Sequence, residues 1–367
     1  MHVALVHYWL VGMRGGERVL EALCEMFPEA DVFTHVCRPE RLSGAIRSHE
    51  IRTTFIQGLP FSSRLYKHYL PLMPLALEQL DLSDYDLVIS SESGPAKGVI
   101  ARPDALHICY CHSPMRYVWD QYPGYLDGKG AATRLAMKAA FHYIRLWDVT
   151  SAARVDRFVA NSAYTASRVR KYWRRESVVV PPPVDIRRFS VSDRDEGYYL
   201  WLGQLVGYKR PDLAVEAFGR SGRRLVMVGR GEELGQLRRR ASPNVEFVEG
   251  ADDAAVARYL AGCRALVFPG AEDFGIVPVE AMASGKPVVA YRAGGASETV
   301  EEGVSGLFFD EPTSESLNAA VDALETDASW VDPAAIRLRA ERFGVERFKE
   351  RMREVIDEST GRNDLAR

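Results

Sequence analysis

The sequence predicts an α/β protein with two doubly wound domains, each built around a parallel sheet. Short apolar runs rich in β-branched residues alternate with helical patterns along most of the 367 residues, and this alternation occurs twice. Several of the runs are apolar throughout, which is typical of parallel strands buried on both faces. The length also suits two domains of roughly 150 residues each. These observations favour two consecutive Rossmann-like units over one large domain.

The expected elements of the first half start near the amino terminus. We expect strands at residues 3–7, 31–36, 87–90, 106–111, 158–160 and 177–180. We expect helices at residues 16–27, 131–153 and 163–173. Ser162 stands directly before the last of these helices, where its side chain would cap the free N–H groups of the first turn.

The second half repeats the pattern. We expect strands at residues 199–205, 225–229, 245–248, 265–269 and 287–291. We expect helices at residues 211–218, 254–260 and 277–283. Pro211 suits the first turn of its helix, because the N–H that proline lacks would have no partner there.

A run of three prolines separates the two halves. Residues 181–183 follow an apolar strand pattern, and none of them can continue a helix or an interior strand. We therefore predict a first domain over residues 1–183 and a second over residues 184–335. The remaining segment, residues 336–367, holds an amphipathic pattern up to Glu358. By periodicity alone it either caps the second domain or crosses back to the first.

Composition and charge exclude several classes of protein. The chain is 47% hydrophobic and 26% charged, as ordinary globular proteins are. Its net charge of −3 argues against a nucleic-acid partner. No uncharged run approaches the ~18 residues of a membrane-spanning helix, and residues 1–6 lack a signal-peptide pattern. The five scattered cysteines fit no common zinc spacing, so we expect reduced thiols and a cytoplasmic location.

Ligands of open parallel sheets bind at the carboxyl ends of the strands, so the loops after strands carry the candidate residues. Gly15 and Gly16 follow the first strand and open a helix, where backbone N–H groups can approach a phosphate. A simple tight turn is the alternative. His112 follows the strand at 106–111 and offers a proton donor, with a buried structural histidine as the alternative.

Two positively charged residues precede the predicted helix at 211–218. Lys209 and Arg210 add charge to a helix amino terminus that already favours anions. This arrangement predicts a phosphate-binding site in the second domain.

The richest stretch runs from Glu272 to Glu280. Two acids and a Phe-Gly turn follow a predicted strand and precede a helix. Three backbone N–H groups would be free there for a diphosphate, those of Gly275, Ile276 and Val277. Glu272 would accept hydrogen bonds from sugar hydroxyls and Glu280 from a ribose diol, since one carboxylate takes two hydroxyl donors.

These residues resemble a known family. Glu272 and Glu280 enclose Phe274-Gly275 and are followed by Ala-Met-Ala-Ser-Gly-Lys-Pro, which resembles the signature of retaining GT-B glycosyltransferases of family 4. Residues 203–218 resemble that family's phosphate loop. Its amino-terminal landmarks are matched by Gly15-Gly16, His112-Ser113-Pro114 and Asn161-Ser162. The likeness covers nearly the whole chain, and bacterial mannosyltransferases that build polysaccharides on lipid-linked intermediates are the most similar members.

The resemblance implies a GT-B fold, in which two Rossmann-like domains face each other across a cleft and the C-terminal helix returns to the first domain. The implied catalytic residues are His112, Glu272 and Lys209. The implied contacts to the nucleotide sugar are Gly15, Gly16, Gln204, Lys209, Arg210, Phe274, Gly275, Ile276, Val277 and Glu280. Glu272 would hold the transferred sugar, Lys209 the diphosphate and Glu280 the ribose, and His112 would touch the sugar near its reacting carbon.

The resemblance further implies retaining transfer of a hexose, mannose from GDP-mannose, to a hydroxyl of a lipid-linked saccharide in bacterial cell-surface polysaccharide synthesis. No metal or cofactor is expected, because Lys209 and helix amino termini would stabilise the leaving diphosphate. Three alternatives stay open: a UDP-sugar-dependent transferase, a nucleotide-sugar epimerase, and a non-catalytic nucleotide-sugar-binding subunit. The last is motivated by Gln204, which stands where many family members carry Arg.

Two basic and aromatic segments predict peripheral contact with the inner face of the plasma membrane. Residues 129–175 hold eleven Lys or Arg against Asp148 and Asp156. The interleaved aromatic residues are Phe141, Tyr143, Trp147, Tyr172 and Trp173. Residues 61–77 add Tyr66, Lys67 and His68. Basic amphipathic surface of this kind binds anionic lipid, and ordinary helix faces packed on one side are the alternative.

Overall fold

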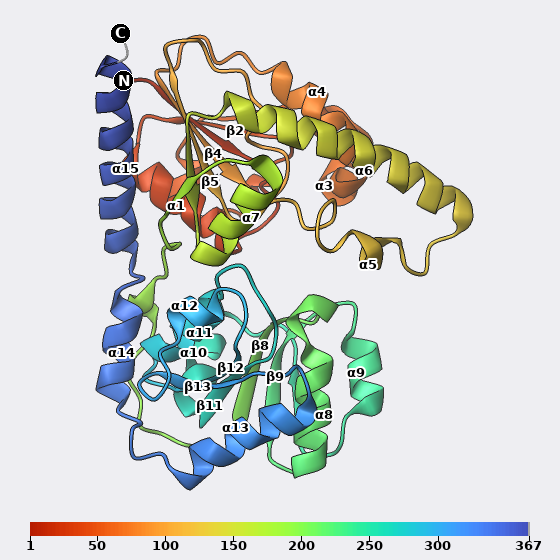
Figure 1. Ribbon diagram of the computed structural model, residues 1–367, viewed down its shortest axis with the longest axis vertical. Helices are drawn as coiled ribbons and strands as arrows, with labels where there is room; N and C mark the ends of the chain where they lie inside the picture. Colours follow the sequence, from red (N-terminus) through yellow and green to blue (C-terminus); the bar gives the residue numbers. More distant parts are fainter. Residues whose placement is uncertain (366–367) are drawn as a thin grey trace. The chain divides into compact units, whose positions relative to one another are not determined.

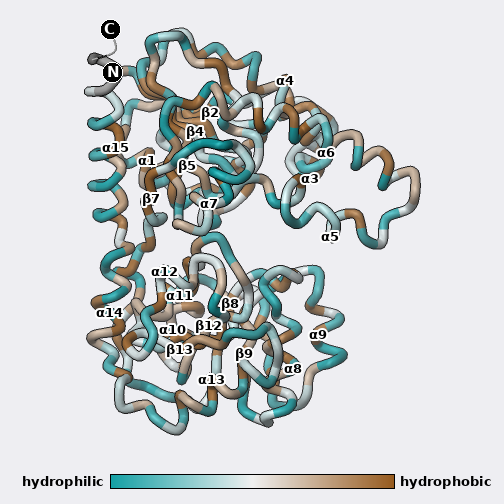
Figure 2. The backbone as a smooth tube through the Cα atoms, viewed as in Figure 1, coloured by the Kyte–Doolittle hydropathy of each residue, from teal (hydrophilic) through white to brown (hydrophobic). Residues whose placement is uncertain are grey.

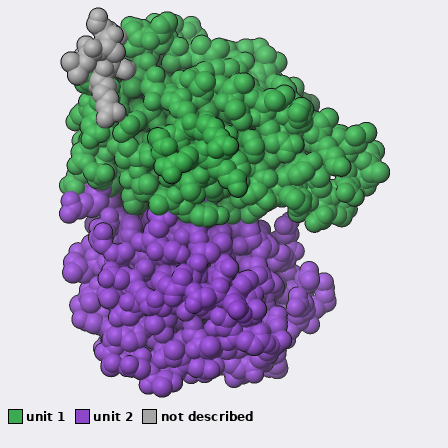
Figure 3. Space-filling view, viewed as in Figure 1, with its two compact units in different colours: residues 1–183, 348–367 green, residues 184–347 purple. Residues whose placement is uncertain are grey.

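The computed structural model describes residues 1–365, with the side chains of residues 1–361. Two compact units divide the chain (Figure 3). Unit 1 consists of residues 1–183 together with the segment that starts at Phe348, and unit 2 consists of Val184–Arg347. Each unit contains one parallel sheet with helices packed against it (Figure 1).

The sheet of unit 1 has seven strands in the order β3-β2-β1-β4-β5-β6-β7, all parallel. Their bounds are β1 Val3–His7, β2 Asp31–Thr34, β3 Ile51–Thr53, β4 Leu87–Glu92, β5 Leu106–Cys111, β6 Arg157–Ala160 and β7 Ser177–Val179. Strand β1 lies between β2 and β4, with Leu5 opposite Val32 and Ile89. All five residues of β1 are buried, which explains why its sequence shows no polar alternation.

The helices of unit 1 are α1 Gly15–Met26, α2 Gly44–Arg47, α3 Ser62–Leu65, α4 Met73–Glu78, α5 Tyr122–Leu126, α6 Ala131–Ser151 and α7 Ala163–Trp173. Short 3-10 turns are η1 Pro39–Arg41, η2 Phe55–Gly58, η3 Tyr66–Leu72 and η4 Ala152–Arg154. Ser162 caps α7 as expected, since its side chain accepts a hydrogen bond from the N–H of Thr165.

The sheet of unit 2 has six parallel strands in the order β10-β9-β8-β11-β12-β13. Their bounds are β8 Tyr199–Gln204, β9 Leu225–Arg230, β10 Val245–Val248, β11 Ala265–Phe268, β12 Val288–Tyr291 and β13 Gly306–Phe309. The helices are α8 Pro211–Ser221, α9 Leu234–Arg240, α10 Asp253–Gly262, α11 Ile276–Ala283, α12 Ala296–Thr299, α13 Ser314–Thr326 and α14 Pro333–Glu341. Two 3-10 turns are η5 Ile186–Arg188 and η6 Gly207–Lys209.

Alternate residues of the unit 2 strands enter two separate hydrophobic clusters. Leu200 belongs to the cluster that includes Met282 of α11, whereas Tyr199 and Trp201 belong to the cluster that includes Phe218 of α8. Side chains of a strand alternate between its faces, so both faces of this sheet are covered by helices. The predicted doubly wound α/β architecture is confirmed in both units.

Each sheet has one place where the strand order reverses. In unit 1 the chain first builds outward from β1 to β2 and β3, and then continues on the other side of β1 with β4. In unit 2 the same reversal lies between β8 and β11. The two loops that leave the carboxyl ends on either side of such a point diverge, and ligands of open α/β sheets bind in the resulting crevice.

The C-terminal segment differs from the prediction. Residues 336–347, which we assigned to the return helix, belong to unit 2, and only the segment from Phe348 onward belongs to unit 1. The predicted continuous helix is broken between α14 and α15 (Val345–Leu365). Phe343 packs in the core of unit 2 against Phe274, and its carbonyl accepts a hydrogen bond from the N–H of Val184. The core contact anchors the end of α14 in unit 2.

Strands β3 and β13 and several helices, including the 13-residue α13, were not predicted. Strand β3 is an edge strand of three residues in which Arg52 and Thr53 are exposed, so it has no apolar run. Strand β13 follows the turn at Gly303, and its first residue lies against β12.

The five cysteines are free thiols, four of them buried.

The aromatic residues assigned to a membrane-facing surface do not all lie on the surface. Phe141, Trp147 and Trp173 are buried, and Tyr172 stacks on Trp119 with ring centroids 4.6 Å apart. These rings pack α6 and α7 against the rest of unit 1, because the apolar side of an amphipathic helix faces the core. Of that set only Tyr143 is exposed.

Candidate functional site

The carboxyl edge of the unit 2 sheet brings together two residues predicted separately. Lys209 lies at the end of η6 after β8, and Glu272 lies in the loop after β11. The Lys209 Nζ donates a hydrogen bond to Glu272 Oε1 at 2.6 Å. Both side chains are largely shielded from solvent without being buried. The pair therefore stands at the reversal of strand order, where a ligand of this sheet would bind.

Two glycines allow these loops to approach each other. A Cβ built on Gly270 would lie 2.6 Å from the Lys209 Cα, so the backbones of the two loops are in direct contact there. A Cβ built on Gly203 would lie 3.6 Å from the Lys209 Nζ. The position of Lys209 is thus set by backbone packing as well as by its ion pair.

The amino terminus of α11 follows Glu272 in the same loop. Gly275 is the residue before the helix and has a φ of 84°, a conformation that glycine adopts without strain. The Phe274 ring is buried against Phe343, so this residue offers its backbone. Ile276 and Val277 form the first turn, where backbone N–H groups have no partner within the helix. An anion beside these groups would be stabilised by the helix dipole.

The other predicted residues of unit 2 lie around this edge. Gln204 is the last residue of β8 and is exposed. Arg210 precedes α8, and its guanidinium binds Asp212 through Nε at 3.0 Å. Glu280 lies one turn into α11 and is half-buried. Lys209 is thus the cation that points to Glu272, while Arg210 is engaged by its own helix.

In unit 1, the predicted glycines begin α1 directly after the loop that leaves β1. A Cβ on Gly16 would collide with the Tyr8 hydroxyl, so only glycine fits there without movement of the ring. The Tyr8 ring in turn lies edge-on to His112, with centroids 6.4 Å apart. The structure therefore places Gly15, Gly16 and His112 in one region at the carboxyl edge of the sheet.

His112 is held through its backbone and its ring. Its N–H donates to the Glu92 carbonyl at 2.8 Å, and its carbonyl accepts from the Asn161 Nδ2 at 2.9 Å. Its Nε2 lies 2.8 Å from the Ser91 Oγ. The same Ser91 Oγ lies 3.0 Å from the His7 Nδ1. Neither His7 nor Ser91 was predicted as a site residue.

Glu17 is a buried carboxyl group in the first turn of α1. Its Oε2 accepts a hydrogen bond from the Arg14 N–H at 3.0 Å. Burial raises the pKa of Glu17 to about 7, against the opposing effect of backbone hydrogen bonds and Arg14. The carboxyl group beside Gly16 therefore titrates near neutral pH.

The raised pKa of Glu17 predicts a pH-dependent stability. Below about pH 4.5 the group is protonated in both states, and between that pH and about 7 only the unfolded state ionises. The free energy of unfolding of the wild type should thus fall as pH rises through this window, by on the order of 3 kcal/mol. Glu17→Gln should lack this fall.

Urea unfolding at pH 5 and pH 8 measures the difference. Glu21→Gln, on the same helix and paired with Arg18 at its surface, is the matched control and should keep the wild-type pH slope. Equal slopes for the wild type and Glu17→Gln would contradict the raised pKa.

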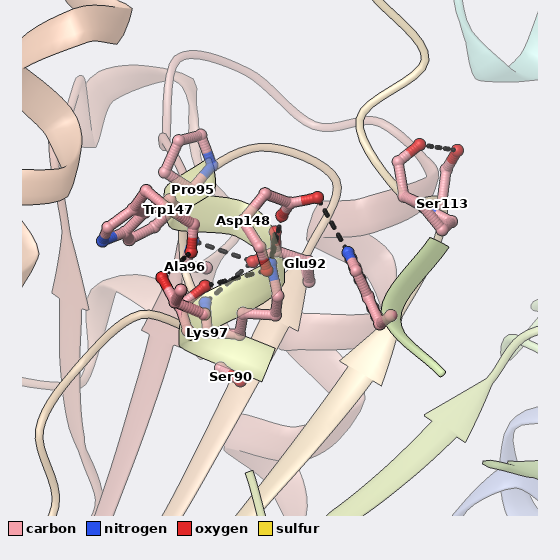
Figure 4. A network of polar contacts seen from close by, with 12 residues as sticks. Ser90, Glu92, Pro95, Ala96, Lys97, Ser113, Trp147 and Asp148 are labelled. Atoms are coloured by element: carbon pink, nitrogen blue, oxygen red, sulfur yellow. Dashed lines mark hydrogen bonds and ion pairs between the residues drawn. The ribbon is translucent and has the colours of Figure 1, made fainter. Parts of the chain in front are cut away.

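A buried charge cluster lies in unit 1 between the end of β4 and α6 (Figure 4). The Lys97 Nζ donates to Glu92 Oε1 at 3.3 Å and to Asp148 Oδ1, and all three side chains are fully buried. Glu92 Oε2 also accepts from the N–H groups of Ala96 and Lys97, at 2.8 Å each. Burial raises the pKa of Glu92 although Lys97 lowers it. We call these three residues the buried triad.

Asp148 of the buried triad connects three elements. Its Oδ2 accepts from the indole N–H of Trp119 at 2.8 Å and of Trp173 at 2.7 Å. Trp119 belongs to the loop that begins at His112, and Trp173 to α7. The triad therefore ties this loop to α6, α7 and β4. Sequence reasoning missed it because Lys97 has the ordinary appearance of a surface lysine.

No group of three or more His, Cys, Asp or Glu side chains in the described part of the chain is arranged to hold a metal ion. No helix in that part combines the length and apolar character needed to cross a membrane. The expectation that no metal takes part stays a prediction.

Each unit has a doubly wound sheet, and the carboxyl edge of the unit 2 sheet carries a cation and a helix amino terminus that suit an anionic ligand. Comparison with known protein families assigns both halves of the chain to glycosyltransferases. Residues 13–188 match the family described as Glycosyltransferase Family 4, and residues 185–342 match Glycosyl transferases group 1. Together the two matches span residues 13–342, and the chain belongs to the glycosyltransferases of group 1 and family 4.

Curated relatives are similar over part of their length. A D-inositol 3-phosphate glycosyltransferase of Geodermatophilus obscurus is 30% identical over 213 residues, covering 47% of this chain and 46% of that protein. A GDP-mannose-dependent alpha-(1-6)-phosphatidylinositol monomannoside mannosyltransferase of Mycolicibacterium smegmatis is 32% identical over 198 residues, covering 45% and 52%. The matches to the first relatives span just under half of their length.

Solved structures share the fold across the whole chain. HepE of Anabaena, in complex with UDP and glucose, has a TM-score of 0.72 at 18% identity and covers 97% of this chain and 99% of its own. WaaG, a glycosyltransferase involved in lipopolysaccharide biosynthesis, has a TM-score of 0.69 at 17% identity and covers 96% and 99%. At sequence identities of 18% and 17%, this similarity shows that the fold is shared.

Proposed function

We propose that this protein is a retaining glycosyltransferase that moves a hexose from a nucleotide sugar to a hydroxyl of a lipid-linked saccharide. The observation that carries the proposal is the Lys209–Glu272 pair at 2.6 Å beside the amino terminus of α11. A cation, a polyol-binding carboxylate and free N–H groups are the three features that a sugar diphosphate needs. Family membership of both units supports the same conclusion.

In this proposal unit 2 binds the donor. Glu272 accepts hydrogen bonds from hydroxyls of the transferred sugar, and Lys209 moves from Glu272 toward the diphosphate. The N–H groups of Ile276 and Val277 bind the same diphosphate, and Glu280 binds the ribose. Arg210 and Gln204 complete the donor site from the end of β8. The carboxylate of Glu272 keeps Lys209 in place until the anion binds.

Unit 1 supplies contacts to the reacting sugar and to the acceptor. His112 touches the sugar near its anomeric carbon, and Gly15 and Gly16 leave room for a phosphate at the start of α1. Transfer breaks the bond between the anomeric carbon and the diphosphate oxygen. The acceptor oxygen forms its bond on the same face, and its proton passes to the leaving diphosphate. Lys209 and helix N–H groups stabilise the charge on that diphosphate, without a metal.

GDP-mannose is the proposed donor. The similar mannosyltransferase of Mycolicibacterium smegmatis is named as dependent on it, and UDP-sugars are the competing choice because HepE is described with UDP and glucose. A thermal-shift panel of GDP, UDP, ADP and dTDP with their sugar conjugates, without added metal, tests both. A ligand that binds the native state raises the melting temperature.

Selective stabilisation by GDP and GDP-mannose is the expected result. Selectivity for UDP-sugars would identify a UDP-sugar as the donor and would leave the proposed transferase activity unchanged. Free isomerised nucleotide sugar in the absence of acceptor would favour an epimerase instead. Binding without turnover on lipid-linked saccharides would favour the non-catalytic subunit, with Gln204 as the first residue to restore to Arg.

A basic apolar surface on unit 1 supports contact with an anionic membrane. The amino-terminal half of α6 is exposed and extends away from the sheet (Figure 1). Between Asp127 and Asp148 the chain has no acidic residue. Hydrophobic and hydrophilic residues alternate along this helix (Figure 2). The neighbouring α3, η3 and α4 add exposed apolar side chains, those of Leu65, Leu72 and Leu75.

Leu135 on α6 is expected to insert into lipid. It is 72% exposed and lies between Arg134 and Lys138. Leu135→Glu should lower binding to phosphatidylglycerol vesicles about tenfold in a flotation assay, through lost burial and added repulsion. Leu338→Glu on α14, where Leu338 is 66% exposed, is the matched control and should bind as the wild type does. Equal flotation of both variants, or flotation that does not depend on anionic lipid, would contradict the proposed membrane contact.

A further inference from the structure

One serine hydroxyl joins two histidines at the strand reversal of unit 1. Ser91 Oγ lies 3.0 Å from His7 Nδ1 and 2.8 Å from His112 Nε2. The three residues come from the end of β1, the end of β4 and the position after β5, which are adjacent strands. His7 and Ser91 are both 1% exposed. The bridge is therefore built into the sheet rather than formed by mobile side chains.

The protonation of the two histidines determines which group donates and which accepts in each hydrogen bond of this bridge. Burial lowers the pKa of His7 well below its usual value, with a smaller contribution from His112, so its ring is neutral and carries one N–H. The His7 Nε2 has no hydrogen-bond partner among the described residues. A buried donor without a partner is rarer than a buried acceptor without one, so the proton belongs on Nδ1, where Ser91 accepts it.

A serine hydroxyl has a single hydrogen to donate. Once Ser91 Oγ accepts from His7, its own hydrogen has one acceptor within reach among the described residues, His112 Nε2, so this nitrogen carries no proton. The proton of a neutral His112 therefore sits on Nδ1. The hydrogen bonds all run in one direction, from His7 through Ser91 to His112.

We propose that His7 and Ser91 are positioning residues that hold His112 in the tautomer with its proton on Nδ1. The inference rests on the proposed function, since the tautomer matters for transfer only when His112 contacts the sugar. With Nε2 occupied by Ser91, the ring offers a donor and not a base to the substrate. The backbone of His112 is fixed as well, because its N–H binds the Glu92 carbonyl and its carbonyl binds the Asn161 side chain.

Histidine NMR on the full-length protein without substrate tests the tautomer directly. The chain has eight histidines, and spectra of His7→Asn and His112→Gln would assign the two rings in the 15N-labelled protein. The expected result is an unprotonated Nε2 and a protonated Nδ1 for His112, and a protonated Nδ1 for His7. Ser91→Ala should convert His112 to a mixture of tautomers. His7→Asn, which keeps an N–H at the same position, should leave His112 as in the wild type.

Ser90→Ala provides the matched control. Ser90 is the neighbouring residue on β4, and its Oγ lies 2.9 Å from His107 Nε2 on the opposite face of the strand. This variant should change the His107 signals and leave His112 unaltered. In transfer assays Ser91→Ala should lower kcat/KM about tenfold with donor affinity unchanged, and Ser90→Ala should have no such effect.

Two results would overturn the inference: a wild-type His112 with its proton on Nε2, or a His112 tautomer that does not respond to Ser91→Ala. Failure of the proposed function has a separate signature. The protein could fail to bind or turn over any nucleotide sugar while His112 shows the expected tautomer and responds to Ser91→Ala. That result would support the His7–Ser91–His112 bridge and contradict the proposed transferase function.

Discussion

Replacing Lys209 with alanine is expected to lower kcat/KM for hexose transfer at least ~100-fold, a loss of about 3 kcal/mol of transition-state stabilisation. In the proposed reaction, charge on the diphosphate grows as its bond to the sugar breaks, and the Lys209 Nζ lies 2.6 Å from Glu272, the carboxylate that we propose binds the sugar. Gln204 supplies no positive charge at the end of β8, so less compensation is available. Steady-state kinetics with the donor identified by the thermal-shift panel measures the effect.

Arg210→Gln is the matched control for charge. Arg210 is the next residue, but its guanidinium binds Asp212 at the start of α8, so its loss should cost far less than that of Lys209. A double-mutant cycle of Lys209→Ala with Glu272→Gln separates binding of the diphosphate from loss of the ion pair. A drop below about tenfold for Lys209→Ala would argue against its role in the transition state.

Replacing Lys97 with methionine is expected to lower the free energy of unfolding by about 3–5 kcal/mol. Methionine keeps most of the side-chain volume but leaves Glu92 and Asp148 facing each other without a cation. Burial lowers the pKa of Lys97, and the two carboxylates raise it by more, so that the ammonium group stays charged. Denaturant unfolding at pH 7 measures the loss.

An exposed ion pair serves as the control for the buried triad. Arg170 and Glu176 are joined by two hydrogen bonds, but both side chains are mostly in solvent. Arg170→Met should leave stability unchanged within error, because exposed pairs gain little from a screened attraction. If Lys97→Met were as mild as Arg170→Met, the triad would not be a structural element of unit 1.

Most of the predicted site residues follow from one rule, that ligands collect in the loops after parallel strands, whereas Gln204 came from the family resemblance. The rule located Gly16, His112, Lys209 and Glu272, which all lie at carboxyl edges in the structure. It missed His7 and Ser91 because they are the last or nearly last residues of their strands. A search that included strand ends on both sides of the expected reversal would have found them.

Local pattern alone determined the doubly wound architecture, the division of the chain after Pro183 and, to within one residue, the start of the helix at Ile276. Periodicity, proline and glycine act through residues close in sequence, so they can be interpreted without coordinates. Only the tertiary structure decided that Lys209 meets Glu272 across 63 residues and that Lys97 meets Asp148 across 51. Such pairs depend on strand order and on how closely the loops pack. Strand order and loop packing cannot be predicted from local periodicity, because they depend on residues that become neighbours only when the chain folds.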